Sequence, residues 1–195
     1  MKLKTCLLSL ACSALPALAL AAPPVSKTVA PGKPAEGTFH RIELAAGPGK
    51  ALPYTIEVPM GWEAHQVAGY PGLWIGPADA KPPEDPRLIW VRGSMVSLAE
   101  PDKVAANIRA NDAADPKWSA PRVEVKDIGG VRGVLVQMNT GEGDKARSSL
   151  TLKLPLAKVS LDIVASATQA EFPQQLALYE RILLSAQPAA SAAAK

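Results

Sequence analysis

The chain has 195 residues, two cysteines, two histidines and a formal net charge of +3. Its 21 basic residues fall to 19, against 18 acidic ones, when Lys2 and Lys4 at the extreme N-terminus are set aside. This near-neutral balance, without a basic block or aromatic residues interleaved with basic ones, disfavours a nucleic-acid partner.

The N-terminus has the order of a secretory signal peptide. Lys2 and Lys4 precede an apolar run over residues 6–20, and Ala19-Leu20-Ala21 matches a small-x-small cleavage site,. We predict a signal peptide over residues 1–21. A membrane anchor is the alternative, but the run is short for a span of about 20 residues, so we expect no stable span after cleavage. The protein is then exported, to the periplasm of a Gram-negative host or otherwise outside the cell.

Both cysteines, Cys6 and Cys12, lie in the segment that would be removed. The mature chain therefore has no disulfide, cysteine nucleophile or cysteine metal site. Residues 22–37 are rich in proline and glycine and predict a disordered leader. Residues 188–195 are alanine-rich and predict a disordered tail. Between them, residues 38–187 form a single domain, long enough to bury a core.

Period-two patterns dominate the domain. They predict strands over residues 39–44, 54–58, 73–75 and 87–93,. Residues 101–113 predict a helix with a narrow apolar stripe, opened by Pro101 and Asp102.

A hairpin follows. Residues 122–128 and 131–138 flank Gly129-Gly130, a pair that suits a tight turn,. The register predicted for this turn places apolar or oppositely charged side chains opposite one another on one face of the sheet. The predicted pairs are Ile128 with Val131, Val125 with Val134, Val123 with Val136, and Asp127 with Arg132.

A second hairpin joins residues 149–154 and 159–165 through a four-residue connection, residues 155–158. Its predicted pairs are Leu154 with Val159, Leu152 with Leu161, and Leu150 with Ile163. All six side chains share one apolar face. A register slip of one residue would bury the polar side chains of the other face, which are Thr151, Lys153, Ser160 and Asp162. Residues 172–186 then predict a helix with a wide apolar face. The fold class is α+β: one mainly antiparallel sheet flanked by two or more helices.

The chemistry-bearing residues are few. No G-x-S-x-G elbow occurs, and His40 and His65 are either general-base candidates or ordinary solvated or hydrogen-bonded imidazoles,. The two histidines lack a zinc spacing motif. Glu142 and Asp144 lack a calcium-loop pattern. The glycine pairs fit no phosphate loop. We predict no catalytic residue, no metal, no cofactor and no enzymatic activity.

The aromatic residues are the remaining candidates for a binding site. Trp62, Tyr70 and Trp74 fall within thirteen residues of a proline- and glycine-rich segment. Such side chains serve as interface anchors or as core residues of β proteins. With Lys145 and Arg147 of a predicted surface loop, they are our candidate partner-binding residues.

The stretch YTIEVPMGW, residues 54–62, together with the helical ending over residues 172–185, resembles the PsbP-like family. The resemblance spans residues 38–187. It implies an antiparallel sheet between helices, an α/β/α sandwich, in which the corner Pro59-Met60-Gly61-Trp62 is architectural. It also implies a protein that acts as an adaptor, assembly factor or partner-binding module. No functional motif of the family maps onto residues of this chain.

The leading hypothesis is therefore an exported, non-catalytic protein-binding domain. It would act as an envelope adaptor, or as an immunity or inhibitor protein against a toxin or lytic enzyme. Its partner is another protein, such as that toxin or an envelope component. A carrier of a small ligand or lipid, with a pocket between the sheet and the C-terminal helix, is the alternative, and a hydrolase that uses His40 or His65 is the third.

Overall fold

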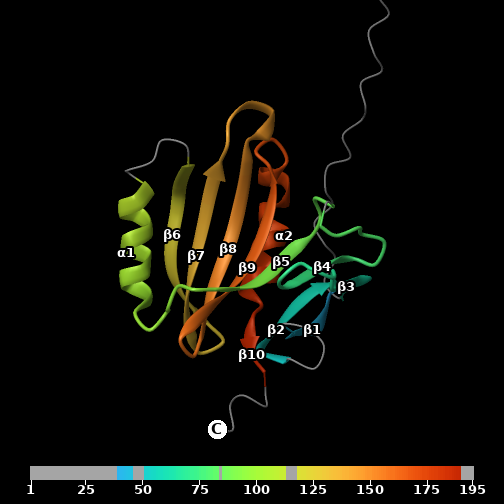
Figure 1. Cartoon of the computed structure of the whole chain (residues 1–195), viewed down its shortest axis with the longest axis horizontal. Coiled ribbons are helices and arrows are strands. Elements are labelled where there is room, and N and C mark those ends of the chain that lie inside the picture. The colour runs from blue at the N-terminus through green and yellow to red at the C-terminus, as the bar shows by residue number, and fades with distance from the viewer. Residues whose placement is uncertain (1–38, 46–50, 84, 113–117, 190–195) are drawn as a thin grey trace, which may run out of the picture. The chain divides into compact units, whose positions relative to one another are not determined.

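The computed structural model describes residues 39–45, 51–83, 85–112 and 118–189 (Figure 1). The predicted signal peptide, the predicted leader and residues 190–195 of the predicted tail lie outside the described residues. None of the helices in the described part is both long and apolar enough to cross a bilayer.

Ten strands, two α-helices and one 3-10 turn make up the described chain. In order they are β1 (Phe39–Ala45), β2 (Ala51–Pro59), β3 (Trp62–His65), β4 (Leu73–Pro77), β5 (Ile89–Ser94), α1 (Pro101–Asp112), β6 (Trp118–Ile128), β7 (Val131–Thr140), η1 (Gly143–Lys145), β8 (Arg147–Leu156), β9 (Val159–Thr168), α2 (Phe172–Leu184) and β10 (Gln187–Pro188).

Two antiparallel sheets result. The large sheet has seven strands in the order β3-β4-β5-β9-β8-β7-β6, and the small sheet has three in the order β1-β2-β10. β2 ends at Pro59 and β3 begins at Trp62, so the Pro59–Trp62 corner carries the chain from the small sheet into the large one. Gly61 has φ +81° there, a conformation that glycine adopts without strain,.

The C-terminal end differs from the prediction. α2 ends at Leu184 rather than at residue 186, and the chain continues into β10, which pairs with β2. Pro188 was assigned to a disordered tail, but it lies in this strand opposite Tyr54, and the Ala189 N–H donates to the Pro53 carbonyl.

The β6–β7 register is as predicted at all four pairs. One detail was wrong: the Ile128–Val131 pair lies on the opposite face from the other three, since successive strand residues alternate between faces. Ile128 packs in the core beneath α2, whereas Val123, Val134 and Val136 pack beneath α1.

The β8–β9 register differs from the prediction by two residues. Leu156 pairs with Val159, Leu154 with Leu161, and Leu152 with Ile163, because the strand continues through Pro155 and turns at two residues, Ala157 and Lys158. A shift of two preserves the face of every side chain, so the apolar set stays buried together.

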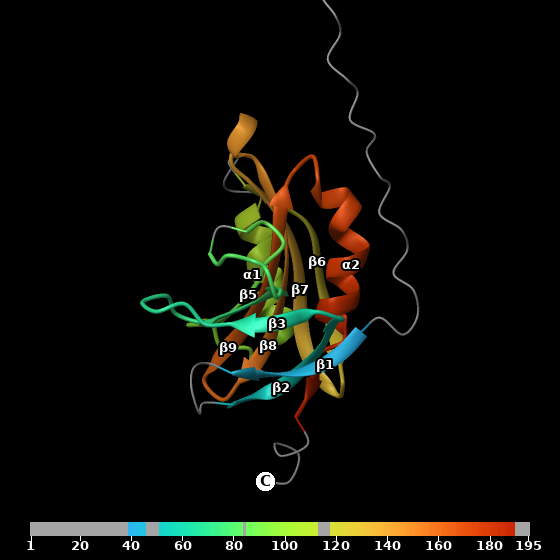
Figure 2. The ribbon, with the colours of Figure 1, turned by 90° about the vertical axis from the view of Figure 1, so that its right-hand side faces the viewer.

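Each face of the large sheet has its own core and helix. Figure 2 shows the strands between α1 and α2, which makes an α/β/α arrangement. The larger core packs α2 against the sheet and includes Leu150, Leu152, Leu154, Leu161, Ile163, Tyr179, Ile182 and Leu183. The smaller core packs α1 against β6 and β7 and includes Ala105, Val123, Val134 and Val136.

Candidate functional site

One face of the large sheet is only partly covered. α1 packs on β6 and β7, and within the described chain no helix packs on this side of β8, β9, β5 and β4. Figure 1 shows the connection from β5 to α1 crossing the sheet below this area. We call the uncovered area the open face. It is defined by side chains that point away from α2: Trp74, Trp90, Arg92, Arg147, Ser149, Lys153, Asp162, Val164 and Ser166.

Two tryptophans lie on the open face. Trp74 of β4 and Trp90 of β5 are cross-strand partners, and their rings stack with centroids 5.3 Å apart and planes 6° apart. The Trp90 Nε1–H donates to the Pro71 carbonyl at 3.1 Å, which fixes the ring. Trp74 Nε1 is buried without an acceptor among the described residues.

Arg92 lies two residues beyond Trp90 on the same face. Its guanidinium carbon is 4.3 Å from the Trp90 ring centroid, a distance typical of a cation–π contact,. The open face thus presents a stacked tryptophan pair with a positive charge on it.

A buried ion pair forms part of the floor. Lys153 and Asp162 are cross-strand partners on β8 and β9, with Nζ and Oδ2 2.6 Å apart. Only 4% of the Asp162 side chain is exposed, and Ser160 Oγ donates to its other oxygen at 3.2 Å. The pair cancels both charges and satisfies the buried carboxylate, as a buried charge requires.

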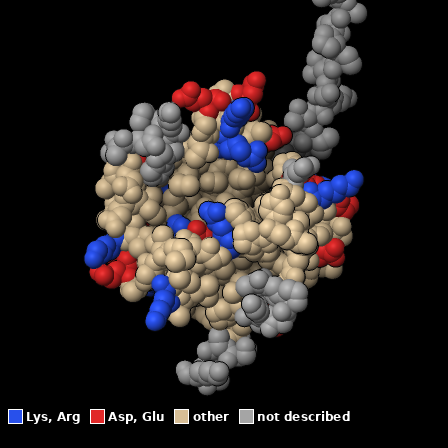
Figure 3. Space-filling model, in the orientation of Figure 1, with Lys and Arg blue, Asp and Glu red and all other residues tan. Residues whose placement is uncertain are grey.

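Two hollows open on this face. One, of about 260 Å³, lies between the tryptophan pair and Arg147. The other, of about 200 Å³, lies between α1 and the Lys153–Asp162 pair and includes Arg92. Val164 lines both, so the two hollows are neighbours on the sheet, and we call them together the trough. Figure 3 shows this side of the molecule hollowed at its centre, with basic side chains in and above the hollow.

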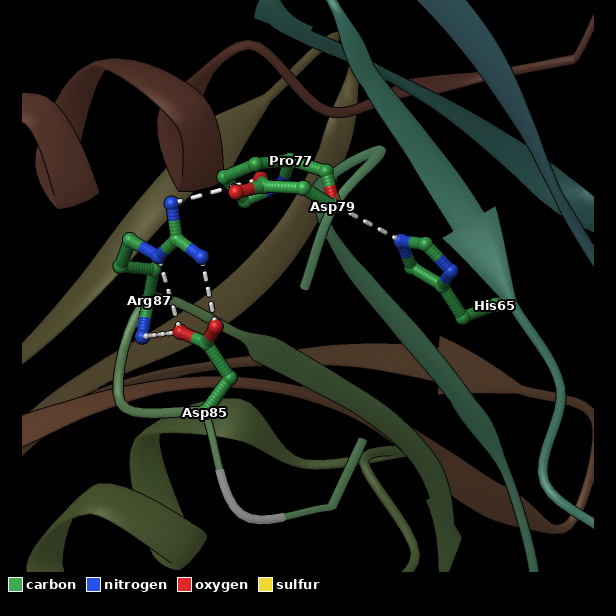
Figure 4. A network of polar contacts seen from close by, with 5 residues as sticks. All are labelled: His65, Pro77, Asp79, Asp85 and Arg87. Atoms are coloured by element: carbon green, nitrogen blue, oxygen red, sulfur yellow. Dashed lines mark hydrogen bonds and ion pairs between the residues drawn. The ribbon is translucent and has the colours of Figure 1, made fainter. Parts of the chain in front are cut away.

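The loop between β4 and β5 borders the trough, and a polar network holds it (Figure 4). Asp85 accepts hydrogen bonds from the backbone N–H of Arg87 at 2.9 Å and from its Nε and Nη2 at 2.9 and 2.6 Å. These bonds from Arg87 lower the pKa of Asp85 to about 2. Arg87 also donates to Asp79 at 3.4 Å.

The two histidines lie in different sheets. His65 Nε2 is 3.1 Å from the Pro77 carbonyl oxygen, and its Nδ1 is 3.9 Å from Glu63 (Figure 4 shows the Pro77 contact). His40 lies on β1, with Nδ1 buried and without a partner in the described chain. Within the residues that the structure describes, no three His, Cys, Asp or Glu side chains gather closely enough to hold a metal.

Only two of the five predicted partner-binding residues come together. Trp74 and Arg147 line the same hollow. Trp62 pairs with Pro77, on the α2 side of the sheet, and so lies on the opposite face from Trp74. Tyr70 is 53% exposed in the β3–β4 loop, and Lys145 is exposed in η1. The sequence does not identify Trp90 and Arg92 as site residues, although their alternation in a predicted strand places them on one face.

The predicted pocket between the sheet and the C-terminal helix is not found beneath the helix but at its side. The space beneath α2 is filled by fully buried side chains such as Leu152, Ile163 and Leu183. A hollow of about 340 Å³ lies beside the helix instead, lined by Trp62, Leu178 and Tyr179 among others.

Comparison with known proteins shows similarity in structure. No family model matches the sequence, and no curated protein matches it significantly. The solution structure of cyanobacterial PsbP (CyanoP) from Synechocystis sp. PCC 6803 is 17% identical, with a TM-score of 0.51, and the match covers 80% of this chain and 96% of that chain.

Two crystal structures are similar at lower scores. PA94 from Pseudomonas aeruginosa, a protein of unknown function, is 13% identical with a TM-score of 0.39, over 61% of this chain and 91% of that chain. LpqN of Mycobacterium tuberculosis, described as involved in cell envelope biogenesis, is 16% identical with a TM-score of 0.45, over 76% of this chain and 90% of that chain. The likeness to CyanoP shows the fold alone. The predicted resemblance is thereby confirmed for the fold: the chain is α+β and PsbP-like.

Proposed function

We propose that this chain, which has the PsbP-like fold, is an exported, non-catalytic module that binds another protein through the open face. One observation carries the proposal: a trough lined by stacked tryptophans and arginines lies on the part of the sheet that no described helix covers. A sheet face that carries large apolar side chains is normally buried against another layer. Tryptophan and arginine are the residue types most enriched among the anchors of protein interfaces.

The connection from β5 to α1 also supports a protein partner. It contains Met95 and Val96, whose side chains are 92% and 42% exposed. Exposed apolar side chains add to the area that a partner can bury. An envelope adaptor and an inhibitor of a toxin or lytic enzyme would both use such a surface, and the identity of the captured partner separates these two roles.

Site-specific photo-crosslinking tests the proposal. A photoreactive residue at Ser149, on the open face, should form adducts with a partner in cells that export the full chain. The matched control places the same residue at Gln174, beside the hollow next to α2. Adducts from both positions or only from Gln174, or none from either, would reject the open face as the interface.

Export is tested separately. N-terminal sequencing of the exported protein should give Ala22 as its first residue.

The hollow of about 340 Å³ beside α2 favours a second candidate function, the carriage of a small ligand. Its apolar wall, formed by Trp62, Leu178 and Tyr179, suits an apolar group. Native mass spectrometry of protein purified from its own host should then show a mass above that of the bare chain, and Trp62→Ala should lose the added mass. A bare mass for the wild-type protein contradicts this function.

A further inference from the structure

We propose that the open face recognises an acidic, extended segment of its partner. One carboxylate would bind at Arg92, a second at Arg147, and a neighbouring apolar side chain would lie against the tryptophan pair. This inference rests on the proposed function, because it names the chemistry of the partner at the same site.

The charged side chains of the trough indicate the charge of the partner. Neither Arg92 nor Arg147 has a carboxylate within ion-pair distance among the described residues; Arg92 contacts the Trp90 ring, and Arg147 donates to Ser166 Oγ at 3.5 Å. The described carboxylates that line the trough are already engaged, Asp162 with Lys153 and Asp85 with Arg87. The unpaired charge on the open face is therefore positive, which favours an anionic partner.

The sheet register gives the spacing. Arg92 pairs with Asp162, and Arg147 pairs with Thr168, so the two arginines lie beside positions six residues apart on β9. Their backbones are about 20 Å apart along the strand direction at ~3.3 Å per residue, but the charged groups reach toward each other. The Arg92 guanidinium lies over the ring of Trp90, which pairs with Val164, and the Arg147 guanidinium reaches Ser166 Oγ. Positions 164 and 166 are about 7 Å apart on β9, and two acidic side chains two residues apart in an extended peptide span the same length.

The tryptophan pair lies beside these two charged groups. Trp90 is held by the Pro71 carbonyl and by Arg92, and Trp74 stacks on it, so the aromatic pair is rigid before anything binds. A preorganised surface loses little conformational entropy on binding. An apolar side chain next to the two carboxylates would contact the pair.

A protein segment fits the trough better than a nucleic acid does. A polymer with a charge at every phosphate is bound by a long row of cations, whereas here two arginines without a described carboxylate partner lie beside an aromatic pair,. Guanidinium groups bind carboxylates with two parallel hydrogen bonds, which gives each end of the segment a defined position.

The test uses a labelled peptide with two glutamates two residues apart and a phenylalanine next to them. Fluorescence anisotropy with the mature protein should show binding that weakens as salt is added. Arg92→Gln and Arg147→Gln should each weaken binding by about tenfold, since each removes a hydrogen-bonded charge pair. Arg181→Gln is the matched control, because it removes the same charge from α2, on the opposite side of the sheet, and should leave binding unchanged. Circular dichroism should show all three variants folded.

Several outcomes would overturn the inference. Equal affinity for a peptide with lysines in place of the glutamates would remove the charge argument. Unchanged affinity in both open-face variants would place the peptide elsewhere. Binding of phosphatidylglycerol vesicles through the same arginines, without binding of the peptide, would assign the face to a membrane surface. If Ser149 crosslinks a partner but no acidic peptide binds, this inference fails while the proposed function stands. Peptide binding without any crosslinked partner would reject the proposed function instead.

Discussion

Gly72 lies where the β3–β4 loop approaches the Trp90 side chain most closely. A Cβ atom added there would overlap the Val91 carbonyl oxygen and lie 2.9 Å from Trp90 Nε1. The residue also has φ +103°, which L side chains rarely adopt,. The absence of a side chain at Gly72 thus allows the loop to accept the hydrogen bond that fixes Trp90 on the open face.

We therefore expect Gly72→Ala to reduce the free energy of unfolding by about 2 to 4 kcal/mol, because backbone strain and a steric clash add together. Urea denaturation measures this loss. Gly61→Ala is the matched control: Gly61 also has a positive φ, but a Cβ there meets nothing within 4 Å. Its loss should be about 1 to 2 kcal/mol, from backbone strain alone. Equal losses in the two variants would show that the close approach to Trp90 does not contribute to the free energy of unfolding.

Asp85 gives a pH-dependent prediction. Its pKa in the folded protein is about 2, below its ordinary value of 3.8, because Arg87 donates hydrogen bonds to its carboxylate. A lowered pKa contributes stability that is present above the unfolded-state value and is lost as the pH falls through about 2,. The stability difference between wild type and Asp85→Asn should therefore be constant above the ordinary carboxyl range and shrink between pH ~4 and ~2. A difference independent of pH would contradict the prediction.

At this scale the sequence predicts part of the site. Trp74 and Arg147 stand out as an aromatic residue near turns and a cation near a loop, and both line the trough. Trp62 is also an aromatic residue near a turn, yet it lies on the α2 side of the sheet. The sequence does not predict this, because β3 is too short for an alternating pattern to show which side chains share a face. Trp90 and Arg92 become site residues only through pairing between strands distant in sequence.

At the scale of the element, the two long hairpins show when a register can be read from sequence. Gly129 and Gly130 both have positive φ, as a two-residue turn requires, and the register predicted from them is correct,. The second hairpin has no glycine at its turn. Pro155 indicates the end of a strand, but the strand continues through it, and its carbonyl accepts a 2.7 Å hydrogen bond from the Tyr54 hydroxyl. A tertiary contact of that kind leaves no local pattern.

The second turn is strained at Ala157, which has φ +38°. The first central position of a type II′ hairpin turn has positive φ and favours glycine. We expect Ala157→Gly to stabilise the protein by about 0.5 to 1 kcal/mol, because relief of strain exceeds the added entropy of the unfolded chain. Thermal and urea unfolding measure the gain. Lys158→Gly, one residue later and without a positive φ, should destabilise by a similar amount. Destabilisation by both variants would mean that the turn is unstrained.

At the scale of the whole molecule, the two helical layers are unequal. α2 buries Phe172, Tyr179, Ile182 and Leu183 in the larger core. α1 buries Pro101 and Ala105, and the core beneath it is small. The sequence predicts this inequality, since one helix has a wide apolar face and the other a narrow stripe. It does not predict that, among the described residues, the narrower helix packs on β6 and β7 alone, because that depends on the order of the strands.

This inequality predicts different local stabilities. Amide hydrogen exchange under native conditions should be at least about tenfold faster in α1 than in α2, because a helix with few buried side chains opens without global unfolding. Ala105→Ser should speed exchange in α1 further and leave α2 unchanged, since Ala105 is fully buried in the smaller core only. Equal exchange free energies in both helices, falling together in the variant, would instead show one cooperative unit.

Ile108 and Asn111 of α1 line the trough, so local opening of this helix would alter the surface that a partner meets. An acidic peptide bound at Arg92 should therefore slow exchange in α1 more than in α2.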